Sequence, residues 1–457
     1  MSAKDERGDE RIFPDTELCR ICIVGLGYVG LPLAVEFAKK RRKTNNTDAE
    51  HIVGFDVSQR RIKELKAGID NTGEVNKNCI EEVSNWLYLT NDIEDIEGSD
   101  VYIVCVPTPV REDKIPDLYP ITSACETIGS AIKKGLNSRK ASQNVVVVFE
   151  STVYPGLTED YCADILEKVT GLTFNQDFFC GYSPERINPG DKKRGITETI
   201  KLTSGSTVEA SRWVDALYKQ IITAGTFMTE SIRIAEAAKV IENTQRDLNI
   251  ALANELAIIF DRMNIDTHKV LEAARTKWNF LDFRPGLVGG HCIGVDPYYL
   301  TYKSAQLGYF PEVVLAGRKI NDNFAEWIMQ KTIREMIRQS KKINGSRVLV
   351  LGLTFKQDCP DIRNTKIIEL IKCAEAYCMK VDIYDPIADA DLAKQIYGVE
   401  LLERLPQNAE YDCVIAAVSH MMFGELSIDE WLAMGVRGCT FVDVKEIIPR
   451  QLESIRL

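Results

Sequence analysis

A glycine-rich turn between a strand pattern and a helix pattern constrains this chain most. In "RICIVGLGYVGLPLAVEFAKK" an apolar run leads to Gly25, Gly27 and Gly30, spaced G-x-G-x-x-G, and a helical periodicity follows. Such glycines allow a tight turn and a close approach of a dinucleotide pyrophosphate, which the N–H groups at the helix start bind. Tyr28 and Val29, between the last two glycines, are expected in the same site. The stretch therefore predicts a Rossmann-like unit with a bound dinucleotide.

An acidic residue should end the second strand of such a unit, where it binds the adenosine ribose. Asp56 ends the strand pattern "HIVGFD", and the polar insertion "RRKTNNTDAE" explains why it follows the glycines at more than the usual distance of about 20 residues. A carboxylate here repels a phosphate on the ribose 2′-hydroxyl, which favours NAD over NADP. Arg61 nearby weakens that inference without reversing it.

Three further strand patterns end in polar loops, in "DVYIVCVP", "NVVVVFEST" and "FFCGYSPERINPGD". Ligands of open α/β sheets bind beyond the carboxyl ends of the strands. Thr108 and Thr152 are therefore candidates for the cofactor or active-site rim, although a threonine after a strand is most often a turn residue. Glu185 and Arg186 are expected at the same edge.

The longest helical pattern extends from about Ser231 to Asn264, with apolar residues at spacings of three and four and no proline or glycine. A helix of this length is expected to link two domains and to bury one face against a partner subunit. Lys239 and Asn243 are four residues apart and share one face. A solvated polar stripe is the alternative, but small and apolar neighbours would partly enclose the lysine.

A second α/β pattern begins at "SRVLVLGLTFK", continues through a helix from about Thr365, and returns with "KVDIYDP", "YDCVIAAVSH" and "CTFVDVKE". The three-glycine fingerprint is absent, so a second dinucleotide is not expected, and Lys356 and Lys445 at strand ends suit the phosphates of another nucleotide. The predicted fold is α/β, with two Rossmann-like doubly wound domains joined by a long central helix. The expected divisions are a flexible tail 1–17, a dinucleotide-binding domain 18–215, a central helical domain 216–330 and a nucleotide-binding domain 331–457.

The segment "GGHCIGVDP" presents Cys292 among glycines, four residues before Asp296. A reactive thiol and a small buried hydrophobic residue are both compatible with this pattern. Cys19 and Cys22 in "CRIC" have the spacing of a redox motif, but they lie in a strand pattern, where a structural role is expected.

Composition excludes several classes. The net charge of −11 argues against a general binder of nucleic acid or of a membrane surface, and no apolar run reaches the ~18 residues of a membrane span. The charged N-terminus lacks the apolar core of a signal peptide, and 13 scattered cysteines fit a reducing compartment, so a cytoplasmic protein is expected. The histidines His51, His268, His291 and His420 form no cluster, and no metal is predicted.

Several ordered motifs make the chain resemble the nucleotide-sugar 6-dehydrogenases, the family of UDP-glucose and GDP-mannose dehydrogenases, and above all its UDP-N-acetylhexosamine branch. They are "VGLGYVGLPLA", "ESTVYPG", "SPERINPGD", "AAKVIENTQRDLNIALANE", "FRPGLVGGHCIGVDPYYL", "GRKINDNF" and "VLGLTFKQDCPDIRNT". The resemblance implies a four-electron oxidation in which one site uses two NAD molecules to convert a primary alcohol of the sugar to a carboxylate.

The resemblance also implies roles for individual residues. Cys292 would attack the aldehyde intermediate, and the thiohemiacetal would be oxidised to a thioester that water hydrolyses. Asp296 would assist deprotonation of the alcohol through a water and later assist hydrolysis. His291 is a weaker candidate for the base of the thiol, because neighbouring residues of an extended loop point apart.

Among the other groups, Lys239 would stabilise negative charge on the sugar oxygen and Asn243 would orient that oxygen. Glu185 would be the general base of thioester hydrolysis, with Thr152 near the water. The family match suggests a UDP-sugar site made of Glu185, Arg186, Lys239, Asn243, Arg284, Gly289, Lys356 and Lys445, and a cofactor site made of Gly25, Gly27, Tyr28, Val29, Gly30, Asp56, Arg61, Thr108 and Thr152. One departure is Pro189, which stands where the UDP-glucose branch has a second glutamate.

Alternatives remain at this point. Without the family, the chain fits an NAD-dependent two-electron hydroxyacid dehydrogenase in which Cys292 is structural, or an inactive NAD-binding sensor. Within the family, UDP-glucose or UDP-N-acetylmannosamine is the runner-up substrate, and N-acetylglucosamine and N-acetylgalactosamine are not distinguished. The family also implies a homodimer or higher homo-oligomer and a role in surface polysaccharide or O-antigen precursor synthesis.

Overall fold

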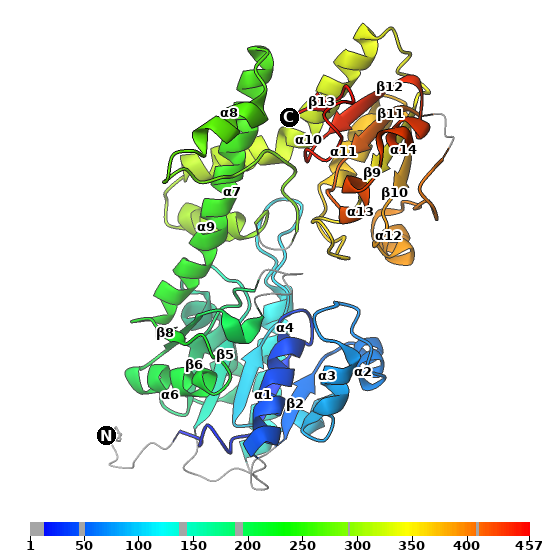
Figure 1. The fold of residues 1–457 in the computed structure, drawn as a ribbon. Helices are drawn as coiled ribbons and strands as arrows, with labels where there is room; N and C mark the ends of the chain where they lie inside the picture. The colour runs from blue at the N-terminus through cyan, green and yellow to red at the C-terminus, as the bar shows by residue number, and fades with distance from the viewer. Residues whose placement is uncertain (1–12, 45–50, 137–143, 188–194, 291–292, 408–410) are drawn as a thin grey trace. The chain divides into compact units, whose positions relative to one another are not determined.

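The computed structural model describes residues 13–44, 51–136, 144–187, 195–290, 293–407 and 411–457, and the chain separates into two compact units (Figure 1). The first unit contains Met1–Glu242 and Tyr298–Leu307, and the second contains Asn243–Pro297 and Gly308–Leu457. Each unit is built around its own sheet with helices packed against it. The predicted α/β fold with two Rossmann-like sheets and a long central helix is confirmed.

The sheet of the first unit has the strand order β3-β2-β1-β4-β5-β6-β7-β8. The strands from β1 to β6 are parallel to their neighbours, β7 is antiparallel to β6, and β8 is parallel to β7. The chain order reverses between β1 and β4, which is where a doubly wound sheet binds its ligand. The bounds are β1 (Ile21–Val24), β2 (Ile52–Phe55), β3 (Leu87–Thr90), β4 (Val101–Val104), β5 (Val145–Phe149), β6 (Phe178–Tyr182), β7 (Lys201–Gly205) and β8 (Thr226–Met228).

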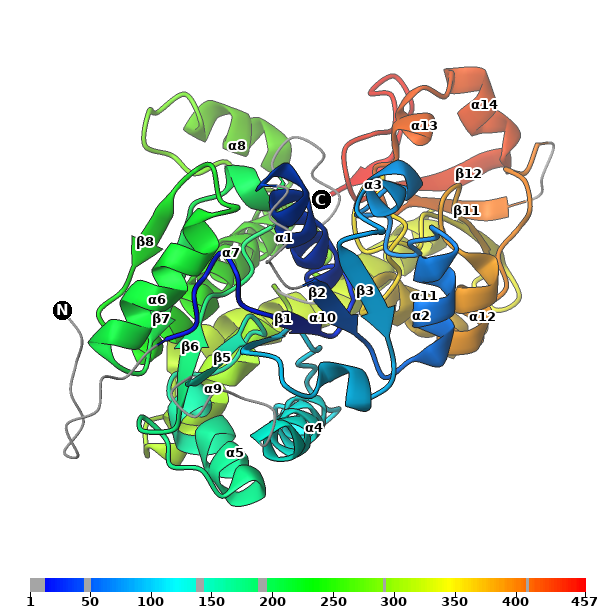
Figure 2. The ribbon, with the colours of Figure 1, turned by 90° about the horizontal axis from the view of Figure 1, so that it is seen from below.

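Helices cover both faces of this sheet. Figure 2 shows α1 and α6 on one side of the strands and α4 and α5 on the other. Because both faces are covered, the central strands are apolar throughout, as in "ICIV" and "VVVVF". The bounds are α1 (Gly30–Thr44), α2 (Gln59–Lys66), α3 (Lys77–Glu82), α4 (Tyr119–Gly135), α5 (Ala163–Thr170) and α6 (Val208–Lys219), with a π-helical turn η3 (Thr158–Cys162) before α5.

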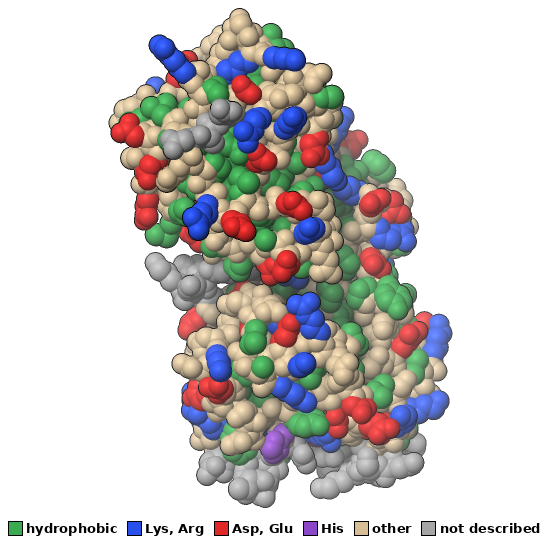
Figure 3. All heavy atoms as spheres, turned by 90° about the vertical axis from the view of Figure 1, so that its right-hand side faces the viewer, with side chains coloured by type: hydrophobic (Ala, Val, Ile, Leu, Met, Phe, Trp, Pro, Cys, Tyr) green, Lys and Arg blue, Asp and Glu red, His purple; other side chains and the backbone are tan. Residues whose placement is uncertain are grey.

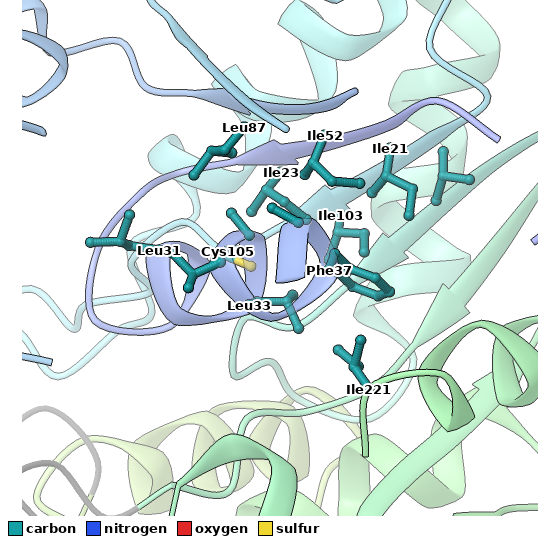
Figure 4. Close-up of a cluster of buried hydrophobic side chains, with 14 of the residues drawn as sticks. Ile21, Ile23, Leu31, Leu33, Phe37, Ile52, Leu87, Ile103, Cys105 and Ile221 are labelled. Carbon is teal, nitrogen blue, oxygen red and sulfur yellow. The ribbon is translucent and has the colours of Figure 1, made fainter. Parts of the chain in front are cut away.

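The core on the α1 side explains the first motif. Ile21 and Ile23 of β1 and Leu33 and Phe37 of α1 are buried in one cluster, and Figure 4 shows them close together between the strand and the helix. Burial of each such side chain stabilises the fold by roughly 1.5–3 kcal/mol. This packing fixes the start of α1 against the end of β1.

The sheet of the second unit has the order β10-β9-β11-β12-β13, and all of its neighbours are parallel. The predicted strands are confirmed as β9 (Arg347–Leu351), β10 (Lys380–Tyr384), β11 (Tyr411–Ala416) and β12 (Gly435–Asp443), followed by β13 (Ile455–Arg456). The helices are α8 (Thr267–Ala274), α10 (Glu312–Arg338), α11 (Ile367–Ala376), α12 (Ala390–Tyr397), α13 (Met421–Gly424) and α14 (Ile428–Ala433).

The predicted long helix is confirmed as α7 (Ile232–Arg262), which passes from the first unit into the second. Within the second unit it is joined to α10 by buried polar contacts. Arg318 Nη1 lies 2.6 Å from Asp247 Oδ1, and Asn321 Nδ2 donates to the same oxygen at 2.8 Å. Paired in this way, the buried charges of the two helices compensate each other.

The CRIC cysteines have structural positions. Cys22 lies in β1 and Cys19 precedes that strand, so the prediction that both lie in one strand was wrong for Cys19. Both are free thiols and buried. Burial raises the pKa of Cys19 to about 12. Two buried protonated thiols do not serve as a redox pair.

On the face drawn in Figure 3, lysine and arginine side chains are interspersed with aspartate and glutamate. None of the helices in the described ranges combines the length and the apolar character that a membrane crossing requires.

Candidate functional site

The three glycines of the turn after β1 meet three different requirements. Gly25 has φ +92°, and a Cβ there would lie 2.8 Å from the carbonyl oxygen of Cys105. A Cβ on Gly30 would lie 1.9 Å from the oxygen of Gly25, so α1 can start this close to the turn only without a side chain. At Gly27 no described atom lies within 4 Å of that position. The open side of the turn fits the pyrophosphate of a dinucleotide.

Asp56 follows β2 and contacts this turn. Its Oδ2 accepts the N–H of Leu26 at 2.9 Å, and Nε of Arg61 donates to the carbonyl oxygen of Leu26 at 2.9 Å. The guanidinium of Arg61 also pairs with Asp70, with 2.7 Å between Nη2 and Oδ1. The cation that weakened the prediction of NAD over NADP is therefore already paired with a buried carboxylate.

Asp70 was missed by the sequence reasoning because it lies in a polar loop without periodicity. Its side chain is fully buried and also accepts N–H groups of Thr72, Glu74 and Val75. Burial raises the pKa of Asp70, but these donors and Arg61 outweigh burial and lower the pKa below its usual value. Asp70 therefore remains a carboxylate.

Thr108 and Thr152 follow the neighbouring strands β4 and β5, which end together because Val104 pairs with Phe149. Both threonines are partly exposed. The loop after Thr152 is attached to α7 through Glu236, whose carboxylate accepts Gly156 N at 2.5 Å and Thr158 N at 3.0 Å. Glu236 is buried. The sequence reasoning missed it, because a glutamate in a helix normally lies on a solvent-exposed face.

Glu185 follows β6 and is buried. Its Oε1 accepts the N–H groups of Arg186 and Ile187, each at 2.5 Å. Its Oε2 is buried without a hydrogen-bond partner among the described residues, so one oxygen can accept a proton from a bound water. The guanidinium of Arg186 forms a bidentate pair with Glu242, at 2.6 and 3.2 Å.

On α7, Lys239 and Asn243 lie one helical turn apart, as predicted from their spacing. Lys239 is buried, at 7% exposure, and its ammonium forms no ion pair or hydrogen bond with another described residue. A buried cation without a partner is costly and suits an anionic or polarised ligand. Asn243 Nδ2 donates to Asp296 Oδ2 at 2.6 Å, and Asp296 is the buried first residue of α9 (Asp296–Gln306).

The predictions for His291 and Cys292 lie outside the described residues. Within the described ranges, His, Cys, Asp and Glu side chains form no group of three or more that could bind a metal ion.

The second unit contains a cavity of about 250 Å³ at the carboxyl ends of its strands. Three of the predicted substrate residues, Gly289, Lys356 and Lys445, line it. Arg284 is not among the lining residues, and its Nε lies 2.8 Å from Asp282 Oδ1. The sequence reasoning missed the remaining lining residues, which are Leu287, Thr354, Phe355, Gln357, Thr365, Lys366, Ile367, Ala417, Val418 and Ser419. Three lysines in one cavity suit a ligand with phosphate groups.

Asp385 follows β10 in the same way that Asp56 follows β2, and its carboxylate contacts the loop after β9 and His420. Oδ2 accepts the N–H groups of Leu353 at 2.6 Å and Thr354 at 3.1 Å, and lies 3.1 Å from Nε2 of His420. The side chain is fully buried. These contacts occupy the carboxylate with the loop beside the cavity.

Three domains of one protein family match three successive parts of the chain. The UDP-glucose/GDP-mannose dehydrogenase family matches through its NAD binding domain at residues 19–222, its central domain at 233–323 and its UDP binding domain at 349–450. The matches include most of the strands of both sheets and nearly all of α7.

Individual relatives extend over nearly the whole chain. A UDP-N-acetyl-D-glucosamine 6-dehydrogenase of Salmonella typhi is 50% identical over 438 residues, covering 96% of this chain and 98% of that protein. A protein of the same name from Pseudomonas aeruginosa is 50% identical, with 96% and 99% covered. The solved structure of a UDP-D-ManNAc dehydrogenase from Pyrococcus horikoshii has a TM-score of 0.82 at 27% identity, covering 96% of this chain and 98% of that one.

Proposed function

The chain belongs to the UDP-glucose/GDP-mannose dehydrogenase family, and from this premise we propose that it oxidises the 6-hydroxyl of UDP-N-acetylglucosamine to a carboxylate with NAD as the electron acceptor. The observation that carries the choice of sugar is the 50% identity, over 96% of the chain, with two UDP-N-acetyl-D-glucosamine 6-dehydrogenases. UDP-N-acetyl-D-mannosamine dehydrogenases are only 28–30% identical. A two-electron hydroxyacid dehydrogenase or an inactive sensor fits these relatives less well.

NAD, when bound, supplies the acceptor for hydride in both oxidation steps. The first step also releases the proton of the sugar hydroxyl. The Lys239 ammonium, buried without a described partner, is suited to stabilise the developing negative charge on that oxygen. Asp296 is suited to take the proton through a water, and its hydrogen bond from Asn243 orients the carboxylate.

The second step needs a tetrahedral adduct before hydride can leave the aldehyde carbon. We assign this role to the thiol of Cys292, which gives a thiohemiacetal and, after loss of the second hydride, a thioester. Water then attacks the thioester, the carbon–sulfur bond breaks, and the thiol is restored. In total one alcohol, two NAD and one water give one carboxylate, two NADH and three protons. Glu185, with one buried unpartnered oxygen, is suited to activate the water, with Thr152 nearby.

Each sheet would bind one nucleotide. We assign NAD to the turn at Gly25, Gly27 and Gly30 together with Asp56, and the diphosphate of the sugar nucleotide to the cavity lined by three lysines. The divisions 18–215, 216–330 and 331–457 remain part of the proposal, although residue 215 lies within α6 and residue 330 within α10. Because Arg186 and Arg284 are paired with Glu242 and Asp282, substrate would have to replace those partners to bind either arginine.

A homodimer through α7 is also part of the proposal. Ile241, Leu252 and Ile259 are between 43% and 55% exposed, and their spacings of eleven and seven residues place them along one side of the helix. A second copy would cover this apolar stripe. We place the reaction in the cytoplasm, since every described cysteine is free. The uronic acid product suits the synthesis of a surface polysaccharide.

The test is a count of NADH per sugar. The purified protein is incubated with NAD and, separately, with UDP-N-acetylglucosamine, UDP-N-acetylgalactosamine and UDP-glucose, beside a Cys292→Ser variant. We expect two NADH per UDP-N-acetylglucosamine and a variant that does not complete turnover. One NADH per sugar, or a variant as active as the parent, would contradict the thiol mechanism, and a preference for another sugar would contradict the substrate.

A further inference from the structure

One antiparallel strand brings a lysine to the edge of the first sheet where the predicted catalytic groups lie. In the pairing of β6 with β7, Gly181 is opposite Gly205 and Tyr182 is opposite Ser204. Extending this register past the end of β6 places Glu185 opposite Lys201, the first residue of β7. If β7 were parallel to β6, its first residue, Lys201, would lie at the opposite edge of the sheet.

Lys201 is enclosed together with two carboxylates. Its Nζ is hydrogen-bonded to Glu150 Oε2 and lies 3.7 Å from Glu185 Oε2. The side-chain exposures of Lys201, Glu150 and Glu185 are 3%, 0% and 9%. Glu150 directly follows β5 and also accepts the hydroxyl of Tyr218, at 2.6 Å. Three buried charged groups of net charge −1 interact strongly, because little water screens them.

The charge of this cluster depends on Glu150. Burial raises the pKa of Glu150 to about 7, although Lys201 acts in the opposite direction. Burial lowers the pKa of Lys201, but Glu150 and Glu185 together raise it by more than burial lowers it. The net pKa therefore lies above the usual value, and the ammonium stays charged. The other titratable groups that face the cluster are the Cys105 thiol, after β4, and the Tyr218 hydroxyl on α6. Burial raises the pKa of both well above their usual values, so both remain neutral near pH 7.

Glu185 is oriented from two sides. The N–H groups of Arg186 and Ile187 bind Oε1, and the only described cation near Oε2 is Lys201. Oε2 is also the oxygen that has no hydrogen-bond partner in the described part of the chain. The ammonium at 3.7 Å is too distant to donate a normal hydrogen bond, yet close enough to attract the carboxylate by its charge.

We propose that Lys201 is a positioning residue that orients Glu185 for its role as a base, and that Glu150 sets how much of the Lys201 charge acts on Glu185. This inference rests on the proposed function, in which Glu185 activates the water that hydrolyses the thioester. Neither Lys201 nor Glu150 contacts the substrate in this scheme. Both act through Glu185.

The proposal predicts opposite effects for two variants. Lys201→Met removes the cation that faces Oε2 of Glu185, so the ascending limb of the pH profile for hydrolysis should move to higher pH by about one unit or more. Glu150→Gln retains acceptors for Lys201 and Tyr218 but removes the competing carboxylate. The full charge of Lys201 then acts on Glu185, and the limb moves to lower pH by about half a unit or more. A purely structural role would not produce shifts of opposite sign.

The assay follows the enzyme–sugar thioester directly. Enzyme, NAD and UDP-N-acetylglucosamine are mixed, quenched at intervals between pH 5.5 and 9, and examined by intact-protein mass spectrometry for the covalent adduct. Below the midpoint of the parent's ascending limb the decay of the adduct should slow about tenfold in Lys201→Met, and Lys201→Arg should restore most of the rate. The matched control is Lys219→Met on α6, which removes an exposed lysine paired with Asp215 and should leave the pH profile unchanged.

The outcomes separate this inference from the proposed function. If the parent enzyme forms neither the adduct nor a second NADH, the proposed function is refuted, whatever the variants do. If the parent forms and hydrolyses the adduct but both variants retain its pH profile, or both shift in the same direction, the role of Lys201 and Glu150 is refuted. Should circular dichroism show that Lys201→Met does not fold, the shift to lower pH in Glu150→Gln and the rescue by Lys201→Arg decide the question.

Discussion

Glu236 should make the first unit less stable as pH rises, and replacing it with glutamine should remove that dependence. The carboxylate is buried on α7 and accepts two backbone N–H groups, from Gly156 and Thr158. Burial raises the pKa of Glu236 from 4.5 to about 7, although both N–H groups favour the ionised form. The folded protein therefore binds a proton that the unfolded chain releases between these two values.

The sign and size follow from that difference. Below pH 4.5 the group is protonated in both states, and its full contribution to stability is present. As pH rises to 7, the unfolded chain ionises first, so the free energy of unfolding falls. Over about 2.5 pH units the loss is about 3 kcal/mol, and it is complete above the folded pKa. For a unit of this size, 3 kcal/mol corresponds to a change of about 6–12 °C in Tm.

Differential scanning calorimetry of the parent and Glu236→Gln between pH 5 and 8 measures this change. Glutamine loses one acceptor, so the variant starts with a lower Tm at pH 5. Between pH 5 and pH 8 it should gain about 5–10 °C on the parent, because about 2.5 kcal/mol of the loss falls in that range. Other titrating groups cancel in the difference. Glu126→Gln, which removes an exposed carboxylate on α4, is the control and should give a constant difference. A constant difference for Glu236→Gln would refute the reasoning.

Two further predictions concern the cofactor turn. Gly30→Ala places a methyl group 1.9 Å from the Gly25 oxygen and should lower both Tm and NAD affinity, whereas Gly27→Ala meets no described atom and should weaken NAD binding at an unchanged Tm. Calorimetric titration and thermal unfolding distinguish them, and equal losses of Tm would contradict the assignment. Asp70→Asn should release Arg61 toward a 2′-phosphate and raise the ratio of NADP to NAD affinity by about tenfold. An equal gain in the Asp70→Asn/Arg61→Met double variant would show that Arg61 is not the cause.

The parts of the fold that were predicted correctly are those in which one physical pattern dominates. The strand "ICIV", the three glycines and the helix after them are readable because two buried faces require apolar runs and a tight turn requires glycine. The helix expected over Ser231–Asn264 was found at Ile232–Arg262, because apolar residues at helical spacing continue over 31 residues without proline or glycine. Parallel strands also share one edge, so residues that follow them could be placed at that edge without knowing their contacts.

The groups that orient those residues could not be predicted in the same way, and the reason is physical. Lys201 reaches the edge only because β7 runs antiparallel to β6, and "KLTSG" carries no signal of strand direction, which depends on packing of the whole sheet. Glu236 and Asp70 lie in a helix and a polar loop where a charged residue is normally solvated, and their burial depends on segments distant in sequence. Periodicity reports which face of an element is buried, whereas a buried charge is explained only by its partners. Residues that would contact substrate were therefore accessible to sequence reasoning, while the residues that set their charge and orientation required the structure.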